Sequence, residues 1–195
     1  MARAEDIAVA LLAAGRSTRF GAADKLAAPL GGRPLVQWAA QAGLTVPARH
    51  HLLVAGPDAA FEVDGYERMT NAAPDQGMAS SLKIAAQAAE QAGVAGLLIL
   101  LADMPLIDAA HLARIVSAFV HDGSRPVFST APDTAPQPPA LLPASLFAAL
   151  QAIDGDKGAR GFAAGASLVA SDAERLLDVD TPDDLERARS LIAPT

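Results

Sequence analysis

Three cationic side chains and a run of small residues lie in one short segment near the start of the chain. Segment 12–25 reads Leu-Ala-Ala-Gly-Arg-Ser-Thr-Arg-Phe-Gly-Ala-Ala-Asp-Lys, and its cations are Arg16, Arg19 and Lys25. Small residues let the backbone pass close to a ligand, and successive free N–H groups can form a nest that binds anions. A triphosphate needs both features, because backbone donors fit its shape and cations stabilise the charge that moves onto its leaving group. The segment therefore predicts a triphosphate site.

The two commonest nucleotide-binding loops do not match this segment. It lacks the Gly-Lys-Ser/Thr end of a P-loop and the Gly-x-Gly-x-x-Gly pattern of a dinucleotide fold. A surface turn with solvated charges is the alternative interpretation. The position of the segment, directly after a predicted first strand at Ile7–Leu12, favours a functional loop.

Two acidic motifs could supply a metal site. Asp103 directly follows the apolar run Leu97–Leu101, and a carboxylate at the end of a buried strand is costly unless it is solvated, paired or bound to metal. Asp180 lies in the second motif, residues 178–184, between a predicted strand and a predicted helix. Two carboxylates about 4 Å apart repel by roughly 4 kcal/mol at an effective dielectric constant near 20. A divalent cation removes this repulsion and can bridge phosphate oxygens.

The other acids of the second motif have simpler interpretations. We expect Asp178 to be a surface residue of a strand, and Asp183 and Asp184 to interact with the positive end of a helix dipole. Asp180 alone could equally be a capping or turn residue. Asp103 is therefore the acid that most strongly indicates function.

Strands that alternate with helices must position these residues. Strands are predicted at Ile7–Leu12, His51–Ala55, Tyr66–Thr70, Leu97–Ala102, Val127–Thr130, Ser167–Ala170 and Leu176–Val179. Helices are predicted at Leu35–Ala42, Met78–Ala92, Asp108–Val120, Ser145–Gln151, Lys157–Ala164 and Thr181–Leu191. Segment 132–143 has five prolines in twelve residues and is expected to be irregular. The alternation predicts an α/β fold, a Rossmann-like three-layer sandwich with a mostly parallel sheet, whose ligands bind at the carboxyl ends of the strands.

Size and composition restrict the class of protein. The 195 residues suit one domain spanning 1–195. No cysteine is present, which excludes thiolate metal sites and thiol nucleophiles and fits a reducing cytoplasm. A net charge of −7 argues against a nucleic-acid partner. The longest apolar stretch, Val94–Ala102, is far shorter than the roughly 18 residues of a membrane span.

The chain resembles the molybdenum cofactor nucleotidyltransferases, and most closely their cytidylyltransferase branch. The family motif Leu-Ala-Ala-Gly-x-Ser-x-Arg-(Phe/Met)-Gly-x-x-Lys-Leu is similar to Leu12–Leu26, with one extra residue here before Asp24. Leu-Ala-Asp-Met-Pro matches Leu101–Pro105, and Asp-x-Asp-Thr-Pro-x-Asp-Leu matches Asp178–Leu185. Segments 76–82 and 155–160 also look like the family's Gly-Met-x-x-Ser-Leu and Gly-Asp-x-Gly-Ala-Arg segments. The resemblance covers nearly the whole chain, and three motifs in order are far more specific than one.

The resemblance implies transfer of CMP from CTP to the phosphate of molybdopterin, with release of pyrophosphate. It implies Mg²⁺, with Mn²⁺ as an alternative, held by Asp103 and Asp180, and catalytic roles for Arg19, Lys25 and Asp103. The implied nucleotide-binding residues are Leu12, Ala13, Ala14, Gly15, Arg16, Ser17, Arg19, Lys25, Gly77, Met78 and Ser81. Related guanylyltransferases have Leu-Ala-Gly-Gly at the start of the motif, so Ala14 favours CTP over GTP.

Two departures from the family pattern concern substrate binding. Gln137 stands where a glycine of a Gly-x-Pro turn is expected, near the acceptor, and glutamine adopts some glycine backbone angles only at a cost. Gln76 stands where an acidic residue is common. Three alternatives therefore stay open: another phosphorylated acceptor, a guanylyltransferase, and a non-catalytic carrier that hands molybdenum cofactor to a molybdenum hydroxylase. The histidines His50, His51, His111 and His121 lie outside the motifs and are expected to be structural or surface residues.

Overall fold

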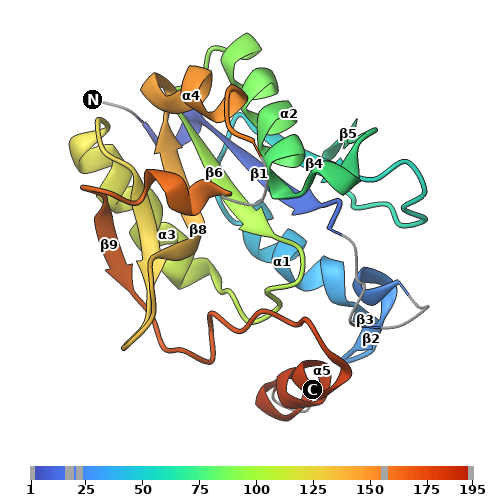
Figure 1. The fold of residues 1–195 in the computed structure, drawn as a ribbon. Coiled ribbons are helices and arrows are strands. Elements are labelled where there is room, and N and C mark those ends of the chain that lie inside the picture. The colour runs from blue at the N-terminus through green and yellow to red at the C-terminus, as the bar shows by residue number, and fades with distance from the viewer. Residues whose placement is uncertain (1–2, 16–19, 21–23, 155–157, 193–195) are drawn as a thin grey trace.

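A seven-stranded sheet forms the centre of the protein in the computed structural model, which describes residues 3–15, 20, 24–154 and 158–192 (Figure 1). The strands lie in the order β5-β4-β1-β6-β8-β7-β9. Their bounds are β1 Ile7–Ala13, β4 His50–Ala55, β5 Glu67–Thr70, β6 Gly96–Leu101, β7 Val127–Thr130, β8 Gln137–Pro143 and β9 Ser167–Ala170. All neighbouring pairs are parallel except the two pairs that β8 makes with β6 and β7. The predicted mostly parallel sheet is confirmed.

Helices cover both faces of this sheet and give the predicted three layers. Their bounds are α1 Leu35–Leu44, α2 Met78–Gln91, α3 Ala109–Asp122 and α4 Phe147–Gln151, with short 3₁₀ helices at Ala4–Asp6, Lys25–Ala27, Pro74–Gln76, Ala144–Leu146 and Ala159–Phe162. Alternate residues of β1 divide between two apolar cores: Val9 and Leu11 pack with α1 and α3, whereas Ala8 and Ala10 pack with α2 and α4. Every residue of β1 is buried, because both faces of the strand are covered.

Side-chain caps fix the start of two helices as the sequence predicts. Asp108 Oδ1 accepts a hydrogen bond from the backbone N–H of His111 at 2.7 Å, at the start of α3. Thr181 and Asp184 form a reciprocal capping box at the start of α5, Pro182–Leu191. Asp184 was predicted to act at the start of this helix, and the structure shows that it does so as the N3 residue of the capping box.

Helix α5 lies away from the sheet, beside a small hairpin that the sequence did not reveal. The hairpin joins β2, Pro29–Leu30, to β3, Arg33–Pro34, and Figure 1 shows both elements at the same end of the molecule. Arg189 of α5 donates to the carbonyl oxygen of Pro29 at 2.9 Å. Helix and hairpin thus form one packed unit. Lys25 lies just before the hairpin in the chain, and Asp180 just before the helix.

The proline-rich segment contradicts its predicted irregularity, because part of it is the central strand β8. Residues Ala140–Pro143 pair regularly with β6, and only Pro143, opposite Gly96 at the end of this ladder, lacks a backbone N–H. Pro138 and Pro139 fall where the β7–β8 register shifts, between Phe128 and Ser129, so a missing N–H disrupts no regular ladder position. The prediction of an irregular segment is therefore wrong for Gln137–Pro143. Gln137 begins β8 without a left-handed backbone angle, so the strain expected of glutamine there is absent.

Two further details differ from the prediction. Segment Leu176–Val179 is not a strand: the N–H of Val179 donates to the carbonyl oxygen of Asp103 at 2.9 Å, beyond the end of β6. Helix α1 continues through Gly43 to Leu44 instead of ending at the glycine. A Cβ atom at position 43 would collide with Tyr66 and would lie 2.9 Å from Leu100, so the glycine is required by close packing and not by helix termination.

A buried hydrogen-bond network around a histidine connects α3 to the register shift between β7 and β8, away from the predicted nucleotide loop. His111 is fully buried, and its Nε2 lies 2.8 Å from Ser129 Oγ. That hydroxyl donates to the carbonyl oxygen of Pro139 at 2.7 Å, so the proton between imidazole and hydroxyl belongs to Nε2. Arg114 donates to Nδ1 at 3.0 Å. The network therefore requires a neutral imidazole and confirms the expected structural role of His111.

We expect acid to weaken the fold through His111. Burial, followed by the charge of Arg114, lowers the pKa of His111 below its ordinary value of 6.5. The unfolded chain then binds more protons than the folded one below about pH 6.5, so stability is complete above that pH and is lost as the pH falls towards the folded-state pKa. Between pH 7.5 and pH 5.5, the free energy of unfolding measured in urea should fall more in the wild type than in His111→Gln, which has no titratable ring. Equal losses would show that His111 is not the group responsible.

Candidate active site

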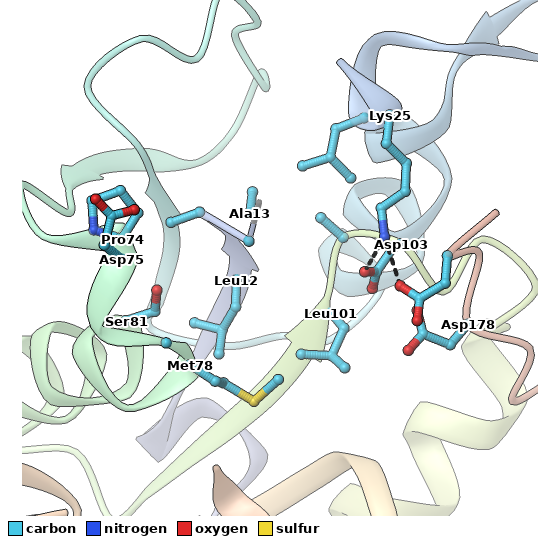
Figure 2. Close-up of a pocket in the computed structure, with 16 residues that line it drawn as sticks. Leu12, Ala13, Lys25, Pro74, Asp75, Met78, Ser81, Leu101, Asp103 and Asp178 are labelled. Atoms are coloured by element: carbon cyan, nitrogen blue, oxygen red, sulfur yellow. Dashed lines mark hydrogen bonds and ion pairs between the residues drawn. The ribbon is translucent and has the colours of Figure 1, made fainter. Parts of the chain in front are cut away.

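A cleft of about 630 Å³ opens where β1 and β6 end. It is lined by Leu12, Ala13, Ala14, Gly15, Lys25, Leu26, Pro74, Asp75, Gly77, Met78, Ser81, Leu101, Ala102, Asp103, Asp178 and Asp180. Segments from the start, the middle and the end of the chain meet here (Figure 2). The position agrees with the rule that ligands bind at the carboxyl ends of parallel strands.

One end of the cleft is lined by the end of β1, by Pro74 and Asp75, and by the first turn of α2. Residues Leu12–Gly15 leave β1, and the first turn of α2 faces them across the cleft, with Met78 and Ser81 among its lining residues. Gly77 precedes α2 with a φ of 77°, a conformation that side-chain-bearing residues rarely adopt. The free N–H groups at the start of a helix favour a negatively charged ligand.

Buried hydrogen bonds hold the start of α2 at the cleft. The side-chain amide of Asn71 donates to Ser80 Oγ at 2.8 Å and to Ser81 Oγ at 3.0 Å. Ser80 in turn donates to the carbonyl oxygen of Gly77 at 2.8 Å. Sequence reasoning singled out Gly77, Met78 and Ser81 but missed Pro74 and Asp75, which also line this end. The sequence offered one indication that Pro74 and Asp75 lie near the site, namely their position between a predicted strand and Gly77-Met78.

The opposite end of the cleft is charged. Lys25 is only 6% exposed, and its Nζ donates to Asp103 Oδ2 at 2.9 Å and to Asp180 Oδ1 at 3.2 Å, as Figure 2 shows for Asp103. Asp178 completes the cluster: one carboxylate oxygen from each of the three acids lies within 4.8 Å of the others. The sequence predicted that Lys25, Asp103 and Asp180 share a site, and they lie together. Asp178 is exposed, as expected, but it lies in a loop and not in a strand, and its carboxylate belongs to the cluster that the sequence did not assign to it.

The charges in this cluster are strongly coupled. Burial alone would lower the pKa of Lys25, but the carboxylates of Asp103, Asp180 and Asp178 outweigh it and raise that pKa, so Lys25 is a cation. Desolvation in the cleft, followed by the negative charges of Asp103 and Asp180, raises the pKa of Asp178 to about 7. Three acids therefore share a single described cation at neutral pH.

Oxygen chemistry and geometry both fit a divalent metal ion in this cluster. Asp103 Oδ1 is buried, and no donor among the described residues hydrogen-bonds to it, which leaves this oxygen available to a ligand. Carboxylate oxygens are the ligands that Mg²⁺ and Mn²⁺ prefer. The residues that could hold the ion are Asp103, Asp178 and Asp180.

Arg16, Ser17 and Arg19 lie outside the described residues, so their predicted contacts with the nucleotide stay predictions. Gly15 and Lys25 bracket that part of the loop, and both line the cleft. Among the described residues, no helix combines the length and apolar character needed to cross a bilayer.

The end of β1 and a lysine–carboxylate cluster line one cleft of a Rossmann-like α/β fold, an arrangement that suits a nucleotidyltransferase. Residues 9–173 match the family described as the MobA-like NTP transferase domain, and the chain belongs to that family. The purine catabolism protein PucB of Bacillus subtilis (strain 168) is 29% identical, over 91% of this chain and 93% of its own length.

Solved structures agree with this assignment of the fold. A homologue of Mycobacterium tuberculosis Rv0371c, from Mycobacterium sp. strain JC1, superposes with a TM-score of 0.81 at 26% identity, covering 96% of each chain. The manganese complex of Rv0371c from Mycobacterium tuberculosis H37Rv superposes with a TM-score of 0.77 at 24% identity, covering 95% of this chain and 99% of the other.

Proposed function

We propose that the protein transfers CMP from CTP to the phosphate of molybdopterin and releases pyrophosphate. An oxygen of the acceptor phosphate attacks the α-phosphorus of CTP, a new P–O bond forms, and the bond to the β-phosphate oxygen breaks. The observation that supports this proposal best is the cleft itself, which places Lys25 and the carboxylates at one end and the β1 backbone at the other. A phosphate acceptor is already ionised, so no side-chain base is needed.

Each described group has a separate task in this proposal. The backbone of Ala13–Gly15 holds the nucleotide, and Lys25, with Arg19, binds the triphosphate and the charge that develops on pyrophosphate. Asp103 and Asp180, with Asp178 beside them, hold Mg²⁺ or Mn²⁺, which neutralises phosphate charge when bound. The manganese in the Rv0371c structure supports a metal site of this kind.

Ala14 is the proposed determinant of the base. It is buried and lines the cleft, so its methyl group takes up room on the side where the base would lie. Ala14→Gly should therefore favour the larger guanine, and we expect the ratio of kcat/KM for CTP to that for GTP to fall at least about tenfold. The exposed Ala60→Gly should leave the ratio unchanged. An unchanged ratio in Ala14→Gly would place base selection elsewhere.

One measurement tests the reaction and its acceptor together. Pyrophosphate release is followed with each of CTP, GTP, ATP and UTP, with and without molybdopterin. The proposal requires release with CTP that depends on molybdopterin. Release with GTP would indicate a guanylyltransferase, and release only with another phosphorylated acceptor would replace molybdopterin. Tight molybdopterin binding without release would indicate a carrier that serves a molybdenum hydroxylase.

A further inference from the structure

Lys25 takes the place of a cation among the acidic residues. Its Nζ contacts Asp103 and Asp180, two of the three acids whose oxygens converge within 4.8 Å. The Lys25 side chain is 8% exposed, against 24% for Asp103 and 37% for Asp180, so the ammonium lies on the inner side of the cluster. A buried charge pair of this kind is stable only when its partners remain in place.

An ammonium and a divalent ion would compete for the negative charge of the same three carboxylates. A Mg²⁺–oxygen bond is about 2.1 Å long, shorter than the 2.9 and 3.2 Å contacts of Lys25 Nζ, so the carboxylates would bind the ion more closely than they bind the lysine. The two cations would also repel. Lys25 carries its charge on a flexible four-carbon stem, which allows the nitrogen to leave the carboxylates without movement of the backbone.

We propose that Lys25 is the counter-ion of the Asp103–Asp178–Asp180 cluster in the nucleotide-free protein, and that the divalent metal ion displaces it. This inference rests on the proposed metal-dependent nucleotidyl transfer. When a triphosphate is bound, the displaced ammonium gains a new anionic partner. Without one, displacement leaves a buried cation unpaired. Metal and nucleotide therefore bind with positive coupling, and the free ion binds weakly.

The proposal predicts that removing Lys25 improves metal binding. Mn²⁺ binding to the full chain is measured by electron paramagnetic resonance without nucleotide, in the wild type and in Lys25→Met. We expect the variant to bind Mn²⁺ roughly 10- to 100-fold more tightly. Lys25→Arg keeps the charge and should resemble the wild type. Lys83→Met removes an exposed lysine that pairs with Asp154 and should also resemble it. If Lys25→Met does not fold, Lys25→Gln carries the same comparison.

If the neutral variants bind Mn²⁺ no more tightly than the wild type, the proposed displacement of Lys25 by the metal ion is wrong. Adding α,β-methylene-CTP should tighten Mn²⁺ binding in the wild type much more than in Lys25→Met, and equal effects would also overturn it. The binding experiment involves no turnover, so it is independent of the proposed reaction. Tighter Mn²⁺ binding by Lys25→Met would support displacement of Lys25 even if the wild type released no pyrophosphate. The absence of pyrophosphate release would reject only the proposed reaction. No Mn²⁺ binding in any variant, with or without the analogue, would reject both.

Discussion

Asp103→Ala is expected to lower kcat for pyrophosphate release by about 10²–10³ while the fold survives, because the change removes a proposed ligand of the metal–triphosphate complex. Asp103 is the acid with a buried, unpartnered oxygen and a direct contact to Lys25, so both the metal and the lysine lose their partner. Its backbone contact, the carbonyl oxygen that accepts from Val179, does not depend on the side chain.

The measurement compares kcat at saturating CTP with circular dichroism of the same preparation. Asp64→Ala, which removes an exposed acid outside the cleft, is the matched control and should keep normal turnover. Near-normal turnover in Asp103→Ala would remove Asp103 from the catalytic machinery.

Lys25→Ala is the second change with a large expected effect, again about 10²–10³ in turnover. The reason differs from that for Asp103: the variant keeps the metal ligands but loses the cation that stabilises charge on the leaving pyrophosphate. It should therefore lose turnover even with saturating Mn²⁺.

A stability measurement accompanies the kinetics of Lys25→Ala. Without the lysine, the carboxylates repel one another with one cationic partner fewer, so the metal-free variant should unfold at a lower temperature than the wild type, and Mn²⁺ should recover more of the loss than it adds to the wild type. Lys83→Ala removes a lysine of an exposed pair and controls for the loss of one charge. Normal turnover in Lys25→Ala would contradict the triphosphate role.

Most of the fold could be predicted from the sequence because the signals for its strands and helices lie in residues that are neighbours in the chain. Continuous apolar runs mark β1 and β6, and caps mark α3 and α5, since each depends on residues that are neighbours in the chain. Strand β8 was missed because Pro138 and Pro139 fall at a register shift against β7. That shift depends on how the two strands pair, so the sequence of β8 alone does not show it.

The same distinction applies to the site. Lys25, Asp103 and Asp180 could be chosen because each follows or precedes a recognisable element. Asp178 could not, because its place beside Asp103 goes with a backbone hydrogen bond between Val179 and Asp103, two residues far apart in the chain. The hydrogen bond from Arg160 to Gln137, at 3.3 Å, is equally non-local.

The packed unit of α5 and the β2–β3 hairpin has a consequence for how the chain folds. Lys25 and Asp180 are 155 positions apart, so their contact closes nearly the longest loop that the chain offers. Contacts of such sequence separation repay their entropy only after the intervening chain is ordered. A molecule with a finished sheet but an undocked α5 would have a stable core and no lysine–carboxylate cluster. We therefore expect the ability to bind a metal–triphosphate complex to appear in the last phase of refolding, after the core is protected from hydrogen exchange.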